Sequence, residues 1–213
     1  MRLIDTHSHL FLEEFSEDLP QVIERARSAG VTHIFMPNID STTIDSMLSV
    51  CNTYNDYCFP MIGLHPTSVN ADYEKELEIV ARELRSFNKY IAIGEVGMDL
   101  YWDKTFLKEQ QIVLDKQINW ALEYDLPVVI HCRDAFGYIY NVLEPYKNTS
   151  LKGVFHSFTG TDDEAARILE FSGFLIGING VVTFKKSRLP EVLTKIPLEK
   201  IVLETDSPYL TPV

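Results

Sequence analysis

Apolar residues along the chain follow two different spacings. Short runs rich in Val, Ile, Leu and Phe alternate with longer stretches in which apolar residues recur every three or four positions. The short runs predict β-strands, and the longer stretches predict amphipathic helices. Eight strands are expected, at Leu3–Asp5, Val31–Met36, Phe59–Gly63, Tyr90–Gly94, Val128–Ile130, Gly153–Phe155, Phe174–Ile178 and Ile201–Leu203.

The stretches between these strands predict seven helices. Their apolar stripes begin at Leu19, Ile44, Tyr73, Leu107, Ile139, Ala165 and Leu189. The strands are continuously apolar, which is typical of parallel strands buried on both faces. Alternation of strand and helix at about 27 residues per unit predicts a (β/α)8 TIM barrel. Few residues follow the eighth strand, so we expect the eighth helix to be missing from this chain.

An open, doubly wound sheet is the competing architecture. It would carry a Gly-x-Gly-x-x-Gly turn after the first strand, but this chain has His7-Ser8-His9 there. No internal repeat, low-complexity tract or Gly/Ser linker interrupts the pattern. We therefore expect residues 1–213 to form one barrel domain.

The net charge of the chain limits the kinds of partner that it can attract. The 213 residues include 31 Asp plus Glu and 19 Lys plus Arg, which gives a net charge of −12. A chain this acidic has no general attraction for polyphosphate, so a basic nucleic-acid-binding face is disfavoured. Any phosphate that the protein handles must be bound locally.

The three cysteines favour a reducing compartment. Cys51, Cys58 and Cys132 show no Cys-x-x-Cys spacing, so neither a disulfide framework nor a thiolate zinc cluster is indicated. No apolar run approaches the ~18 residues that a membrane span needs. A cytoplasmic protein without a membrane partner is expected.

Histidines and carboxylates gather where the predicted strands end. His7 and His9 follow the first strand. Residues two apart in an extended chain point to the same side, so both imidazoles can face one point. The other strand ends carry His65, Glu95, His131, His156, Glu204 and Asp206. In an α/β barrel, catalytic residues converge at this carboxyl-end rim.

Four of these histidines and two of the carboxylates form a nitrogen and oxygen donor set without thiolate. The six are His7, His9, His131, His156, Glu95 and Asp206. Such donors suit Zn²⁺, Mn²⁺, Mg²⁺ or Fe, and six ligands exceed the need of one tetrahedral ion. Two ions are therefore expected, with Glu95 suited to bridge them. The alternative is a metal-free cluster, which would need many compensating hydrogen bonds.

Six sequence motifs together resemble one family. They are Asp5-Thr6-His7-Ser8-His9, Gly63-Leu64-His65-Pro66, Gly94-Glu95-Val96-Gly97-Met98-Asp99, Pro127-Val128-Val129-Ile130-His131-Cys132-Arg133, His156-Ser157-Phe158-Thr159-Gly160 and Glu204-Thr205-Asp206-Ser207-Pro208-Tyr209-Leu210. In order and spacing these blocks resemble the TatD family of metal-dependent deoxyribonucleases, within the amidohydrolase-like barrels. The resemblance covers the whole chain.

The resemblance implies a TIM-barrel hydrolase with two divalent metal ions, for which Mg, Mn and Zn are the candidates. It implies that His7, His9, Glu95 and Asp206 hold one ion, and that Glu95, His131 and His156 hold the other. Family activity is nuclease, commonly exonucleolytic on single-stranded DNA and sometimes on RNA. Some relatives are assigned removal of D-amino acids from tRNA. Family members usually continue into a further loop and a closing helix, so a less stable or less active barrel is expected here unless a partner or second copy covers the gap.

The predicted reaction is hydrolysis of DNA phosphodiester bonds by metal-activated water. Asp206 is expected to orient or deprotonate that water, and Glu95 to bridge the ions. His65 and Arg133 are expected to contact substrate oxygens, while Glu204 is expected to orient a metal-binding histidine. An ion pair of Arg133 with Asp134 or Asp99 is the structural alternative for that arginine.

Other readings stay open. Tyr101 and Trp102 can stack on a base or merely anchor their loop, and His33, inside the second predicted strand, is expected to be structural. Hydrolysis of a small ester or amide is the second enzymatic reading, although many such barrels carry a modified lysine where this chain has Glu95. A non-catalytic remnant that binds metal or a partner is the third. The expected partners are single-stranded DNA, with RNA or tRNA as alternatives, and the expected state is a monomer or weak homo-oligomer.

Overall fold

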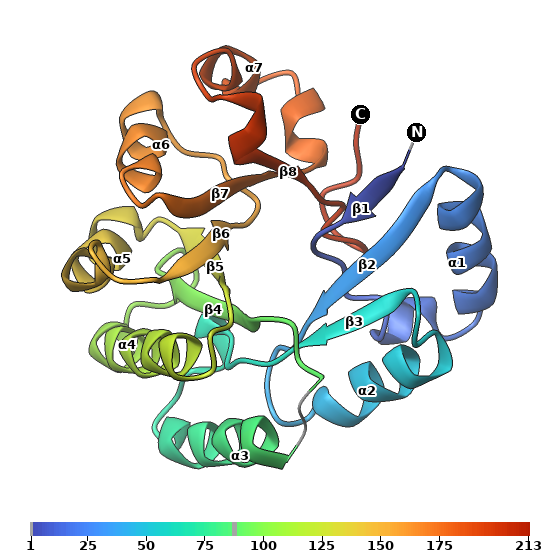
Figure 1. Ribbon diagram of the computed structural model, residues 1–213, viewed down its shortest axis with the longest axis horizontal. Helices are drawn as coiled ribbons and strands as arrows, with labels where there is room; N and C mark the ends of the chain where they lie inside the picture. Colours follow the sequence, from blue (N-terminus) through green and yellow to red (C-terminus); the bar gives the residue numbers. More distant parts are fainter. Residues whose placement is uncertain (1, 87–88) are drawn as a thin grey trace.

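A ring of parallel strands surrounded by helices is the architecture of this chain (Figure 1). The computed structural model describes residues 2–86 and 89–213. Within these ranges the strands are β1 Leu3–Asp5, β2 Val31–Pro37, β3 Cys58–Met61, β4 Ile93–Asp99, β5 Val128–Arg133, β6 Lys152–Phe155, β7 Gly173–Ile178 and β8 Ile201–Leu203. The predicted TIM-barrel class is confirmed.

Helices lie on the outside of the ring, one after each of the first seven strands (Figure 1). In the described residues they are α1 Leu19–Ser28, α2 Ile44–Thr53, α3 Tyr73–Ser86, α4 Leu107–Glu123, α5 Phe136–Leu143, α6 Asp162–Leu169 and α7 Leu189–Leu193. Each predicted stripe falls in one of them. Residues 204–213, after β8, contain no α-helix, as predicted.

Hydrogen-bonded ladders divide the ring into two arcs. One arc has the order β1-β2-β3 and the other has the order β4-β5-β6-β7-β8, with all ladders parallel. Single bridges join the arcs, Ser8 with Ser207 at one seam and Ile62 with Ile93 at the other. Backbone hydrogen bonds also cross the seams, such as that from the Thr6 N–H to the Leu203 carbonyl at 3.1 Å and that from the Ile91 N–H to the Pro60 carbonyl at 3.0 Å.

Large apolar side chains fill the interior. Met36, Ile93, Met98, Phe155 and Phe174, from β2, β4, β6 and β7, are all buried to 1% exposure or less. Complete burial of such a side chain stabilises the fold by roughly 1.5–3 kcal/mol. The packed core holds the strands so that their carboxyl ends present polar residues at fixed positions.

The fourth strand lies further along the chain than predicted. The prediction was Tyr90–Gly94, whereas β4 spans Ile93–Asp99. Gly94 and Gly97 resemble strand breakers in the sequence, yet they allow the neighbouring strand to approach closely. A Cβ atom at Gly97, whose φ is +140°, would lie 2.0 Å from the carbonyl oxygen of His131 on β5. The consequence is that Glu95 lies inside β4 and not beyond its end.

Other boundaries differ less. The largest of these differences are that β3 ends at Met61 and not at Gly63, and that β5 continues from Ile130 to Arg133. The extension of β5 follows its pairing with the longer β4, in which Asp99 lies opposite Arg133. In the part of the chain that the structure describes, no helix combines the length and apolarity that a membrane crossing requires.

Candidate metal centre

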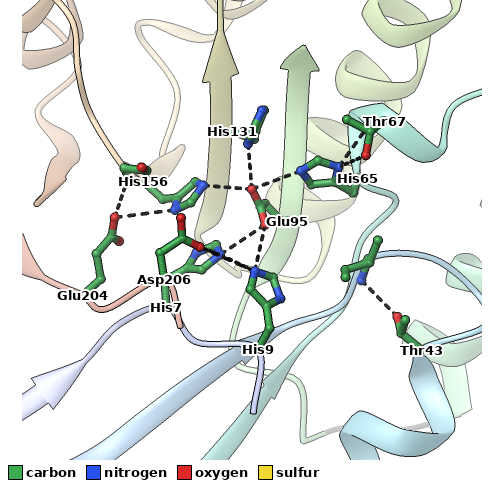
Figure 2. Close-up of polar contacts among 12 residues, drawn as sticks. His7, His9, Thr43, His65, Thr67, Glu95, His131, His156, Glu204 and Asp206 are labelled. Carbon is green, nitrogen blue, oxygen red and sulfur yellow. Dashed lines mark hydrogen bonds and ion pairs between the residues drawn. The ribbon is translucent and has the colours of Figure 1, made fainter. Parts of the chain in front are cut away.

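The Glu95 carboxylate is the centre of a buried polar cluster at the carboxyl end of the barrel (Figure 2). Five imidazoles surround it, from the ends of β1, β3, β5 and β6. Oε1 lies 2.8 Å from His156 Nε2, 2.9 Å from His131 Nδ1 and 3.3 Å from His65 Nε2, and Oε2 lies 3.1 Å from His7 Nε2 and 3.6 Å from His9 Nε2. One carboxylate thus faces five nitrogen donors.

Asp206 enters the cluster across the seam between β1 and β8. Its Oδ1 lies 3.7 Å from Nε2 of both His7 and His9. Its backbone N–H donates to the His7 carbonyl at 2.9 Å, and the N–H of His9 donates to the Ser207 carbonyl at 2.8 Å. The φ of Asp206 is 59°, a left-handed conformation that costs about 1–3 kcal/mol in a residue other than glycine. Such strain at a polar cluster is typical of a functional site.

The Asp5 carboxylate forms hydrogen bonds on both sides of this seam. Its carboxylate accepts the backbone N–H of His7 at 3.3 Å, the N–H of Thr205 at 2.9 Å and the Thr205 hydroxyl at 2.7 Å. These bonds connect β1 to the segment after β8. Asp5 therefore fixes the position of His7 relative to Asp206.

Two further carboxylates orient histidines of the cluster. Asp99 Oδ2 lies 3.0 Å from His131 Nε2, and Glu204 Oε1 lies 3.5 Å from His156 Nδ1. Glu204 also accepts the backbone N–H of Ser157. A carboxylate that takes the outer N–H of an imidazole leaves the inner nitrogen with a lone pair for a cation. The His131–Asp99 pair has this arrangement, with Nδ1 of His131 toward Glu95. His156 presents Nε2 to Glu95, but its Nδ1 lies near Glu204 without a hydrogen bond.

His65 is held in a different way. Its Nδ1 accepts the backbone N–H of Thr67 at 3.2 Å and lies 2.7 Å from the Thr67 hydroxyl. A backbone N–H can only donate, so Nδ1 presents a lone pair and the proton of neutral His65 is on Nε2. That proton faces Glu95. His65 is thus arranged to donate a hydrogen bond to an oxygen.

Burial and neighbouring charges set the protonation of the cluster. Burial lowers the pKa of His7 well below its ordinary value and lowers that of His9 to about 4. Burial opposes ionisation of Glu95 too, but the adjacent His156, His65 and His7 hold the pKa of this carboxyl well below its usual range. His7 and His9 are therefore neutral, with lone pairs available beside an ionised carboxylate.

His156 and Asp206 are shifted in the opposite direction. Burial alone would lower the pKa of His156, yet Glu95 and Glu204 hold it well above its ordinary value. Burial raises the pKa of Asp206 to about 7. His156 and Asp206 therefore both favour their protonated forms when no other cation is bound. A metal ion in the cluster would supply positive charge in place of those protons.

The donor atoms fit a metal ion. His7 Nε2 and His9 Nε2 are only 3.2 Å apart, and both face Glu95. His7 Nδ1 is buried with no hydrogen-bond partner in the described structure. Three groups have ligand atoms within 4.8 Å of one another, namely His7 with His9 and Glu95, His7 with His156 and Asp206, and His65 with Glu95 and His131. These imidazole nitrogens and carboxylate oxygens are donor types that divalent metal ions prefer.

The structure brings together all six residues predicted as ligands, and Glu204 lies beside His156 as expected. Their assignment to particular ions stays a prediction. His65, predicted as a substrate contact, lies inside the cluster, with its Nε2 3.3 Å from Glu95 Oε1. His33 stacks on Phe59 at 5.4 Å, in agreement with a structural role.

The alternative ion pair of Arg133 is not observed. Among the described residues neither Asp134 nor Asp99 forms an ion pair with it, and its guanidinium lies over the Tyr101 ring instead. Asp5 and Asp99 are the polar residues that the sequence analysis did not assign to the site. Both stand inside the quoted motifs, and Asp99 would have been found if β4 had been extended to its true end.

A cavity of about 620 Å³ opens in front of the cluster. Its lining includes Glu95, His131 and Asp206 on the inner side, and Trp102, Arg133 and Tyr209 on the outer side. A ligand that enters this cavity can contact the buried donors and the exposed rim at the same time.

Comparisons with known proteins agree with this geometry. Residues 4–213 match the family described as TatD related DNase. The uncharacterized metal-dependent hydrolase YabD of Bacillus subtilis (strain 168) is 36% identical over 99% of this chain and 82% of its own length. The 3'-5' ssDNA/RNA exonuclease TatD of Pantoea ananatis (strain LMG 20103) is 32% identical over 99% of this chain and 81% of its own length.

A solved structure shows the same fold. The crystal structure of YjjV, a TatD homologue from Escherichia coli K12, superposes with a TM-score of 0.90 at 33% identity, over 100% of this chain and 82% of that one. The chain thus spans about four fifths of the length of these relatives. It belongs to the TatD family of metal-dependent hydrolases.

Proposed function

We propose that this protein is a two-metal phosphodiesterase that degrades single-stranded DNA from an end. The observation that carries the proposal is the ring of five imidazoles and Asp206 around the Glu95 carboxylate, which provides donors for more than one ion. The exonuclease name of the Pantoea relative supports the substrate class.

In this proposal the six ligands divide into two sets that share Glu95. His7, His9, Glu95 and Asp206 would hold one ion, and Glu95, His131 and His156 would hold the other. When bound, Mg²⁺, Mn²⁺ or Zn²⁺ would acidify a water molecule and neutralise phosphate oxygens. Asp206 orients that water and accepts its proton, while Asp99 and Glu204 keep the two outer histidines in the required orientation.

His65 and Arg133 bind the substrate in this scheme. The Nε2 proton of His65 is placed to donate to a phosphate oxygen, because Nδ1 already accepts from Thr67. Arg133 is exposed at the rim of the cavity, where its N–H groups can reach a second oxygen. The net charge of −12 makes these local donors more important than any general attraction.

Other substrates remain part of the test. Deacylation of D-aminoacyl-tRNA, or hydrolysis of a small ester or amide, would use the same ions and water. We assign the protein to the cytoplasm and expect a monomer or weak homo-oligomer. A chain that bound metal or a partner without catalysis would fail on every substrate.

The decisive experiment is cleavage of end-labelled single-stranded DNA by metal-analysed protein. Cleavage that depends on Mg²⁺ or Mn²⁺, stops with chelator and disappears in Glu95→Ala and Asp206→Ala is the expected result. Parallel assays use D-aminoacyl-tRNA and a panel of small esters and amides. Turnover of one of those without DNA cleavage would replace the proposed function. Inactivity of the metal-loaded protein on all of them would instead support a binding protein.

A further inference from the structure

Two aromatic residues and one arginine form an exposed group at the rim of the cavity. Tyr101 and Trp102 follow the end of β4, and Arg133 is the last residue of β5. Asp99 and Arg133 are paired in the β4–β5 ladder, and the Leu100 N–H donates to the Arg133 carbonyl at 3.0 Å. The two segments are thus held side by side by backbone contacts.

The three side chains pack against one another. The Arg133 guanidinium carbon lies 3.8 Å from the centroid of the Tyr101 ring and 5.3 Å from that of Trp102. The two rings are 4.9 Å apart and perpendicular, at 89°. A cation against an aromatic face stabilises an exposed group by about 0.5–1 kcal/mol. The group is therefore pre-arranged, although its aromatic surface faces solvent.

The exposure of the rings is unusual for their size. Tyr101 is 53% exposed and Trp102 is 72% exposed. Rings that served only to anchor the loop would be expected to bury most of their surface. Trp102 keeps a ring available for a ligand, and Trp102 and Arg133 both line the cavity that contains Glu95.

A buried carboxylate connects this group to the metal centre. Asp99 Oδ1 accepts the backbone N–H of Tyr101 at 3.0 Å, while Asp99 Oδ2 lies 3.0 Å from Nε2 of His131. Asp99 is only 3% exposed. The exposed group consequently has a fixed position relative to His131.

From this geometry we infer that Trp102, with Tyr101 and Arg133, forms a stacking site for an unpaired nucleobase of the DNA strand whose phosphodiester is held at the metal centre. The inference rests on the proposed function and adds to it how the strand is held. Every base has an aromatic face, so stacking grips a strand without sequence preference and without the basic groove that this chain lacks. A paired base is stacked within its duplex and is not available, so the site selects single strands.

The test removes the ring from the protein and the base from the substrate. Trp102→Ala is compared with wild type on single-stranded oligonucleotides in which a propanediol spacer, which has no base, replaces each successive nucleotide. Wild type should show an increase in KM of about tenfold when the spacer occupies one particular position, since stacking is worth ~1–3 kcal/mol per base. Trp102→Ala should show the same increase on the unmodified strand, and little further change with the spacer.

Matched variants separate stacking from damage to the fold. Trp102→Phe should retain most of the effect, because a smaller ring still stacks. Tyr124→Ala removes another exposed ring, 37% exposed, at the end of α4 and before the start of β5, and it should leave the KM for every substrate unchanged. Metal content and melting temperature are measured for each variant.

A binding measurement keeps the inference separate from the proposed function. Strands with 2-aminopurine at each position are mixed with protein, and fluorescence is recorded before turnover. Stacking predicts quenching at one position in wild type and its loss in Trp102→Ala. Quenching without cleavage would overturn the proposed function and support the stacking site. Cleavage without position-specific quenching, or with equal KM losses on spacer and unmodified strands in Trp102→Ala, would overturn the stacking site alone.

Discussion

The buried cluster around Glu95 and the exposed group around Arg133 share strands β4 and β5 but follow different physical rules. In the cluster, a carboxylate that is 3% exposed lies among five imidazoles. At the rim, Arg133 and Trp102 are held by ring contacts and the backbone, and most of the Trp102 ring is free. Under the proposed function, we expect the cluster to determine which reaction is possible and the rim to determine which ligand is held.

The largest effect is expected from Glu95→Gln, which removes the central charge and keeps the shape. Hydrolytic activity should fall at least about 10³-fold, because several kcal/mol of charge stabilisation depends on bound ions. Metal analysis should show loss of bound ions in the same variant. Retained metal together with full activity would show that the cluster does not control the chemistry.

Removal of metal by a chelator should lower the stability of the folded protein through the cluster, and it should do so independently of the residues at the rim. An ion present at 1,000 times its dissociation constant stabilises the folded state by about 4 kcal/mol. Removing it with chelator should therefore lower the melting temperature, and adding Mn²⁺ or Zn²⁺ should restore it. Trp102→Ala should show the same chelator-induced shift as wild type. An unchanged melting temperature in chelator would argue against metal in the folded protein.

Gly97→Ala tests the close contact of β4 and β5 on which both regions depend. The new Cβ would lie 2.0 Å from the His131 carbonyl oxygen, at a backbone φ of +140°. A loss of about 3 kcal/mol in the free energy of unfolding is expected, measured by urea denaturation. Gly137→Ala is the matched control, because its Cβ would meet no atom within 4 Å. Since Gly137 lies in α5, that change should stabilise the protein by about 0.5–1 kcal/mol.

Asp99→Asn tests the connection between the two regions. The amide oxygen can still accept the His131 N–H but carries no negative charge, so it raises the basicity of the imidazole less and metal affinity should fall about 10–100-fold. Isothermal titration with Mn²⁺ measures the change. Asp103→Asn, an exposed change in the same loop, should leave the affinity unaltered. Equal losses in the two variants would show that loop charge, and not the His131 contact, is responsible.

The smallest effect is expected from Arg133→Lys at the rim. Lysine keeps the charge but loses the flat surface that stacks on Tyr101, which is worth about 0.5–1 kcal/mol. The KM for single-stranded DNA should rise about two- to fivefold with metal content unchanged. A loss of bound metal in this variant would mean that the rim and the cluster are not separable.

Sequence reasoning was most successful where chemistry coincides with strand ends. His7, His9, His131, His156 and Asp206 stand next to apolar runs, and a barrel brings such positions to one rim. Their convergence on Glu95 follows from the fold class, so it could be predicted without coordinates. Glu204 was predictable on the same basis.

The other features of the site depend on contacts between distant segments, which no local sequence pattern predicts. Glycines such as Gly94 and Gly97 are typical of strand ends, so the sequence predicted that the fourth strand ends there. Only the close approach of the His131 backbone shows why glycine is needed at position 97 inside β4. Asp99 was missed as a partner of His131 for that reason. The stacking of Arg133 on Tyr101 and Trp102 depends on the pairing of Asp99 with Arg133, which the predicted strand lengths did not include.

The seam between β1 and β8 has a consequence for the order of folding. Asp5 and Thr205 are 200 residues apart in the chain, yet their side-chain contact and the nearby His7–Asp206 backbone bond bring the two ends of the ring together. Such distant contacts form late, because most of the chain must be ordered before they can be made. A nascent chain without its last ten residues has Glu95 and the histidines but not Asp206. The complete set of donors therefore exists only in molecules that have closed the ring, and metal binding would select the finished fold from its incomplete forms.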